Sequence, residues 1–111
     1  KKARQGIEKI AHSSGARCNF IPGVVFPALE FDDKNKELYE KAKKIAKGLD
    51  YDLPAGSSGG GSEGSHLSAA GVPVIDGIGI KGGNAHAVDE YIDIQDFSFR
   101  AALITALCIE V

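Results

Sequence analysis

The sequence contains no methionine, and its first residue is Lys1 rather than a translation start. A helical pattern begins directly after Lys2, and another helical pattern still continues at Val111. Neither end has the features of a natural terminus. We therefore expect the chain to be part of a longer protein.

Cysteine is scarce, since Cys18 and Cys108 lie far apart and form no CxxC pair. A disulfide between them is one interpretation, but we expect two buried thiols in a reducing compartment. No apolar run reaches the roughly 20 residues that a membrane-spanning helix needs, and no secretory signal opens the chain. We therefore expect a soluble, cytoplasmic protein that has no membrane partner.

Neither sign of charge is in large excess, because 13 basic residues stand against 15 acidic ones. The resulting net charge of −2 indicates no surface for polyanions. Lysines gather between Lys41 and Lys47, but Ala and Ile interrupt them at helical spacing, as on a solvated helix face. Nucleic acid is therefore not an expected partner.

Hydrophobic periodicity predicts two helices in the first half of the chain. The first covers residues 3–14, and Gly15 is placed to stop it. The second follows a cap at Asp32 or Asp33 and ends at Gly48, with lysines in its last turn. These are the clearest local signals in the first half.

Two more helices are predicted in the second half. The Ser62 hydroxyl can cap a short helix over residues 63–70. A last helix is capped by Asp93 or Asp96. Its expected buried side consists of Phe97, Ala101, Ile104, Leu107 and Cys108.

The remaining regular segments indicate strands. Residues 17–21 and 24–26 suggest one strand, interrupted at Pro22 and Gly23. Residues 72–80 are rich in β-branched side chains without polar alternation, which suits a strand covered on both faces of a parallel sheet. Helix and strand alternate along the chain, so the predicted fold class is α/β.

The glycine-rich loop over residues 59–64 can present backbone amides at the start of a helix, as anion sites do. It lacks the Gly-Lys-Ser/Thr ending of a phosphate-binding loop. Residues 57–62 also have the composition of a flexible linker, and Glu63 also suits a first helical turn. A non-catalytic anion- or partner-binding α/β module that uses this loop is therefore an alternative function.

His86 lies in a polar loop just past the predicted strand, where open α/β sheets bind ligands. An imidazole there suits a metal ligand or a general acid/base, and Asp89 and Glu90 are near enough in sequence to orient its second ring nitrogen. A surface histidine without a role is the other interpretation. His12, near the end of the first helix, and His66, within the short helix, form no metal-binding motif with it.

A catalytic zinc ion needs about three protein ligands. The sequence contains neither an HExxH motif nor cysteines at paired spacing. If His86 binds a metal, most of the other ligands therefore lie outside this sequence.

Two motifs together carry a resemblance to a known family. They are Gly59-Gly60-Gly61-Ser62-Glu63-Gly64 and Gly83-Asn84-Ala85-His86-Ala87-Val88-Asp89-Glu90-Tyr91-Ile92-Asp93-Ile94. At this separation they resemble the aminoacylase and glutamate-carboxypeptidase family of dinuclear zinc hydrolases, which includes acetylornithine deacetylase and succinyl-diaminopimelate desuccinylase. The resemblance covers about half of the chain strongly.

The resemblance implies that His86 is the last ligand of a two-zinc centre, with cobalt or manganese as alternative metals. It implies a substrate cleft lined by Gly60, Gly61, Ser62 and Glu63. The parent protein would cleave an amide bond in an N-acyl amino acid or a small peptide.

The resemblance also implies a division of the chain into two parts. Residues 1–28 would be a helix-strand tail of an inserted lid (dimerisation) domain, which leaves a homodimer open. Residues 29–111 would be the C-terminal part of the catalytic domain, with helices layered on a mostly parallel sheet.

Several family features differ or have no counterpart. Glu63 stands where the family usually has Asp, Ala87 and Val88 replace a small polar residue and Pro, and Phe26 replaces an Arg that grips a substrate carboxylate in some members. The family's His-x-Asp motif, bridging Asp and Glu-Glu pair have no match. The general base is thus absent from this chain, no catalytic residue is assigned to it, and we expect it to be inactive alone.

Overall fold

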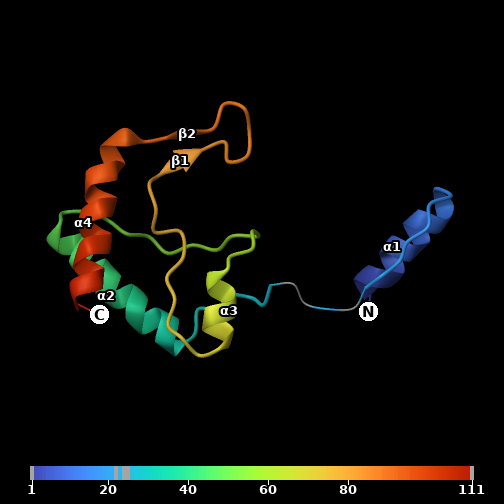
Figure 1. Cartoon of the computed structure of the whole chain (residues 1–111), viewed down its shortest axis with the longest axis horizontal. Coiled ribbons are helices and arrows are strands. Elements are labelled where there is room, and N and C mark those ends of the chain that lie inside the picture. The colour runs from blue at the N-terminus through green and yellow to red at the C-terminus, as the bar shows by residue number, and fades with distance from the viewer. Residues whose placement is uncertain (1, 22, 24–25, 111) are drawn as a thin grey trace.

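The computed structural model describes residues 2–21, 23 and 26–110. Figure 1 shows the order of the elements along the chain. They are α1 (Lys2–Ser13), α2 (Asp33–Gly48), α3 (Gly64–Ala69), β1 (Gly82–Gly83), β2 (Tyr91–Ile92) and α4 (Ile94–Glu110). Among the described residues, no helix is both long enough and apolar enough to cross a membrane.

The first helix, α1, ends where the sequence predicts. Gly15 follows it with a φ of 74°, and the N–H of Ala16 donates to the carbonyl of Ala11. In Figure 1 this helix stands apart from the other elements. Only Ala11 of α1 is buried, while Ile7 and Ile10 are 49% and 69% exposed. The domain boundary at residue 28 stays a prediction.

The strand predicted after α1 is not found at residues 17–21, which carry no secondary structure. A strand needs a neighbouring backbone to pair with, and local β-propensity cannot supply one. The second half of this predicted strand includes residues 24 and 25, which lie outside the described residues.

The second helix, α2, confirms its predicted ends. The Asp32 side chain accepts a hydrogen bond from the N–H of Asn35 at 2.9 Å, so Asp32 rather than Asp33 is the N-cap. The helix ends at Gly48. Its buried residues Ala42 and Ala46 are small, which lets another helix approach closely.

The last helix, α4, packs on α2 with a different face from the one predicted. Its buried residues are Asp96, Arg100 and Leu103. The expected buried side is largely exposed instead: Phe97 is 56% and Ile104 40% exposed, Ala101 and Cys108 are exposed, and only Leu107 is half-buried. The prediction failed because the buried face contains the Asp96–Arg100 ion pair. A hydrophobicity pattern assigns charged residues to the surface, so it could not identify this face as buried.

The prediction of buried thiols is also wrong, since Cys18 and Cys108 are both exposed and free.

The core between α2 and α4 is small. It contains Ala42, Ala46, Leu53 and Leu103, with partly buried apolar side chains around them. The chain exposes 8986 Å², whereas a compact protein of this mass exposes about 5,800 Å². Its radius of gyration is 19.0 Å, against about 13 Å for a compact domain of this length. Much apolar surface is thus uncovered.

The described part of the chain is a mixed helix–strand structure with a two-stranded antiparallel sheet, in which Gly82 pairs with Ile92 and Gly83 with Tyr91. The expected mostly parallel sheet is not found there, and residues 72–80 carry no strand. The Val74 N–H donates to the Asn35 side chain at 2.7 Å instead of to a neighbouring strand. The expected cover on both faces is not found either, because residues 72–80 are exposed or only partly buried and Val72 is 49% exposed.

Candidate functional site

A large cavity opens beside the glycine-rich loop. Its volume is about 1290 Å³. Gly60, Gly61 and Ser62 line it, together with Phe26 and Arg100 from other parts of the chain. Of the four predicted substrate-binding residues, these three lie at the cavity, while Glu63 is exposed and not among its lining residues.

Two glycines of the glycine-rich loop pack closely against other segments. A Cβ on Gly61 would come within 3.3 Å of the Phe26 ring, and a Cβ on Gly64 would come within 2.8 Å of a Val74 methyl group. The Ser62 hydroxyl accepts a hydrogen bond from the Gly64 N–H at 3.1 Å, at the start of α3. These contacts favour a packed loop over the flexible linker that its composition also allows.

Several amides near this loop already donate to acceptors of the same segment. The Gly60 N–H donates to the Ser58 hydroxyl, and the Gly64 N–H to the Ser62 hydroxyl. The N–H groups of Ser65 and His66 donate to the carbonyls of Ser62 and Glu63. These four donors are not directed at an external anion, and α3 has only six residues. These four donors are therefore not available to the anion-binding interpretation.

His86 lies in the turn between β1 and β2, and it is exposed. Its φ is 69° and that of Asn84 is 56°, a backbone region that few residues other than glycine adopt. The turn is held by its own side chains: Asn84 donates to Asp89 at 2.9 Å, and the His86 N–H donates to Glu90 at 3.3 Å.

The expected role of the two carboxylates as partners of the imidazole ring is therefore not what the structure shows. Asp89 accepts from the Asn84 amide, and Glu90 accepts from the backbone of His86 rather than from its ring. The backbone N–H groups of a tight turn need acceptors, and adjacent carboxylates are the nearest ones.

The structure does not assemble a metal centre around His86. In the described part of the chain, no group of three or more His, Cys, Asp or Glu side chains is arranged to hold a metal ion. The lining of the large cavity does not include His86 either. The residues present therefore do not by themselves fit a catalytic zinc ion, which needs about three protein ligands.

The other two histidines occupy the elements predicted for them. His12 is in the last turn of α1. His66 is in α3, where its ring packs against Phe26 at 5.1 Å between centroids. Phe26 therefore bridges the glycine-rich loop and α3 from the wall of the cavity.

A buried polar network lies at the start of α4, and the sequence interpretation missed it. Arg100 Nε donates to Asp96 Oδ2 at 2.9 Å, with only 8% and 4% of the two side chains exposed. The Tyr51 hydroxyl donates to Asp96 Oδ1 at 2.6 Å, and its ring stacks on Phe99 at 3.5 Å. The Asp–Arg spacing of four residues on a predicted helix was the available signal.

Hydrogen bonds keep Asp96 ionised despite its burial. Burial alone would raise its pKa, but donation from the Tyr51 hydroxyl, the Lys81 N–H and the Arg100 guanidinium outweighs that effect and lowers the pKa from 3.8 to about 2. The Tyr51 hydroxyl also raises the pKa of the nearby Lys81 ammonium group. Asp96 and Lys81 are therefore both charged at neutral pH.

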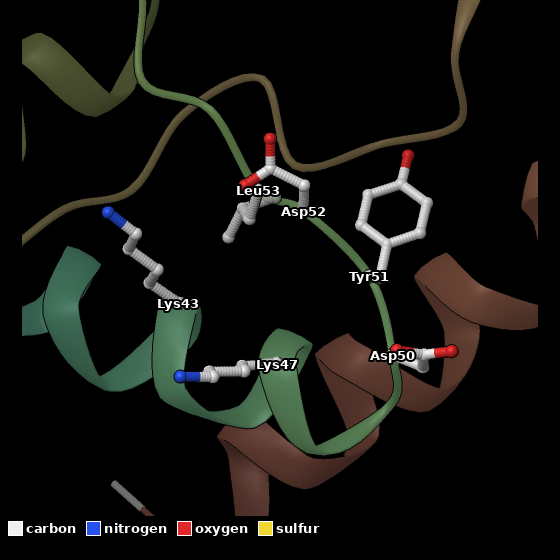
Figure 2. Close-up of a pocket in the computed structure, with 6 residues that line it drawn as sticks. All are labelled: Lys43, Lys47, Asp50, Tyr51, Asp52 and Leu53. Carbon is white, nitrogen blue, oxygen red and sulfur yellow. The ribbon is translucent and has the colours of Figure 1, made fainter.

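A second, smaller hollow of about 410 Å³ lies at the end of α2. Figure 2 shows its lining residues, with Lys43 and Lys47 extending from the helix and Asp50 to Leu53 following it. The two lysines lie together on the helix, and Asp50 and Asp52 lie on the segment that follows it. None of the predicted site residues lines it.

Comparison with known proteins identifies one family. The model of Peptidase family M20/M25/M40 matches residues 17–110, which is most of the chain and includes both motifs. Neither the curated proteins nor the solved structures contain a match.

Proposed function

Because the chain belongs to Peptidase family M20/M25/M40, a family of metallopeptidase-type hydrolases, we propose a more specific role for it. It is the C-terminal part of an aminoacylase- or glutamate-carboxypeptidase-type dinuclear zinc hydrolase. The parent protein cleaves an amide bond in an N-acyl amino acid or a small peptide, in the cytoplasm. The observation that carries the proposal is the single family match that spans the glycine-rich loop and the His86 loop.

The large cavity supports a substrate-binding role for the glycine-rich loop. Gly60 and Gly61 present backbone without side chains at its wall, so a substrate can approach the main chain closely. Phe26 and Ile75 give the cavity an apolar part, while Arg100 and Glu30 give it charged groups. Apolar surface with a few polar groups is typical of small-molecule sites.

The role of His86 is that of one metal ligand among several. The turn leaves it exposed, and among the described residues no group of three or more His, Cys, Asp or Glu side chains is arranged to hold a metal ion. The proposal therefore assigns the remaining ligands and the general base to the rest of the parent protein. Zinc, when bound there, would polarise the substrate carbonyl and activate water.

Replacing His86 tests this assignment. In the parent protein, His86→Ala removes one ligand, so we expect loss of zinc and at least about a hundredfold loss of amide hydrolysis. The control is His12→Ala, which changes an exposed histidine of α1 and should leave zinc content and hydrolysis unchanged. Full zinc content and activity in the His86 variant would remove this residue from the metal centre.

A further inference from the structure

The hairpin that carries His86 leaves and rejoins the rest of the molecule at the first turn of α4. The Lys81 N–H donates to Asp96 Oδ2 at 2.9 Å, just before β1. The Lys81 carbonyl accepts from the Asp93 N–H at 2.7 Å, just after β2. The backbone N–H and carbonyl of Lys81 are therefore both hydrogen-bonded to residues at the start of α4.

The carboxylate that holds Lys81 is itself held from two sides. Tyr51 donates to one oxygen and Arg100 to the other, from the segment after α2 and from the next turn of α4. Arg100 also reaches the Ile78 carbonyl at 3.4 Å, three residues before Lys81. Because Tyr51 and Lys81 lie on segments other than α4, Asp96 cannot shift relative to them without breaking charge-assisted hydrogen bonds.

The hairpin has little else to anchor it. Its residues from Asn84 to Ile92 are all exposed, and its strands pair over two residues each. Figure 1 shows it projecting from the start of α4. A two-stranded hairpin of this size is marginal by itself, so the bonds at its base determine its orientation.

We infer that Asp96 is the positioning residue for the His86 hairpin. With Tyr51 and Arg100 it fixes Lys81, and Lys81 sets the direction in which the hairpin leaves the body of the molecule. The inference rests on the proposed function insofar as His86 is the group being positioned. The hydrogen bond between Asp96 and Lys81 at the base of the hairpin does not depend on a bound metal.

Amide hydrogen exchange of this chain, measured by NMR without metal, tests the inference. Asp96→Ala removes the acceptor of the Lys81 N–H, so the amides of residues 82–92 should exchange about tenfold faster relative to those inside α2. Asp96→Asn keeps an acceptor oxygen and should restore part of the protection. Asp52→Asn, the same change at an exposed carboxylate beside Tyr51, should leave the hairpin unchanged.

Tyr51→Phe provides an independent variant if Asp96→Ala does not fold. It removes only the hydroxyl that holds Asp96 Oδ1 and keeps the ring that stacks on Phe99. It should accelerate exchange in the hairpin more than in α2. Equal acceleration of hairpin and α2, or an unchanged hairpin, overturns the inference.

The hydrogen-exchange experiment and the activity test of His86→Ala have independent outcomes. A responsive hairpin together with a fully active His86→Ala parent would leave Asp96 as a positioning residue and remove the metal role. An unresponsive hairpin with an inactive His86→Ala parent would overturn only the positioning role.

Discussion

Asp96 is a carboxylate in an almost fully buried position, and three donors surround it: Tyr51, Lys81 and Arg100. Sequence patterns place such a residue at the surface, since an aspartate near a helix start is normally a cap. Asp93 does serve as the cap, by accepting from the Gln95 N–H at 3.0 Å. The two candidate caps therefore have different roles, which only the packing distinguishes.

The network at Asp96 predicts a specific loss of stability in acid. Its pKa is lowered from 3.8 to about 2 in the folded chain, so the unfolded chain takes up the proton first as the pH falls. The stabilisation by Asp96 is complete above its unfolded pKa and is lost as the pH falls through the folded value. We expect the melting temperature to decrease between about pH 4 and pH 2, and to decrease less in Asp96→Asn. Melting curves over this range would contradict the account if wild type and variant shifted in parallel.

At the candidate site, the sequence located the loops but not their internal contacts. Glycine at Gly60 and Gly61 and the turn around His86 are local features, so their positions followed from the sequence. The partners of Asp89 and Glu90 depend on the fold of the turn, and the ring-orienting role expected for them was wrong. The assignments of Gly60 to Glu63 and of His86 stay predictions.

Among the elements, the helices were predictable because their signals are local. Asp32 and Gly48 bound α2 as capping and stop residues do. The strand at residues 72–80 and the buried face of α4 were not, because both depend on what lies beside them. The Val74 N–H donates to the Asn35 side chain rather than to a neighbouring strand. On α4, the Asp96–Arg100 pair is buried where apolar residues were expected.

The packing of the glycine-rich loop gives a prediction for Gly64. A Cβ there would lie 2.8 Å from a methyl group of Val74, a side chain with little rotamer freedom. Gly64→Ala should therefore lower the free energy of unfolding by about 1–2 kcal/mol, even though alanine favours the helix. Gly59→Ala is the matched control, since a Cβ on Gly59 meets nothing within 4 Å. Urea unfolding of both variants checks this, and equal stabilities would show that the loop is not packed against Val74.

For the whole molecule, the fold class was predictable only in part. The chain belongs to Peptidase family M20/M25/M40, and helices and strands are both present. The exposed area of 8986 Å² and the exposed apolar face of α4 show that this chain does not cover its own apolar surfaces. Sequence periodicity marks such surfaces as apolar without saying which chain or segment covers them.

We propose that this chain supplies one metal ligand and one wall of the cleft, rather than a complete metal centre. Zinc titration of the isolated chain, followed by calorimetry, tests it most directly. One ligand at His86 falls short of the about three that a catalytic zinc needs, so we predict no tight stoichiometric uptake. Tight binding of one zinc ion per chain, abolished by His86→Ala, would contradict the claim and show that the chain builds a metal site by itself.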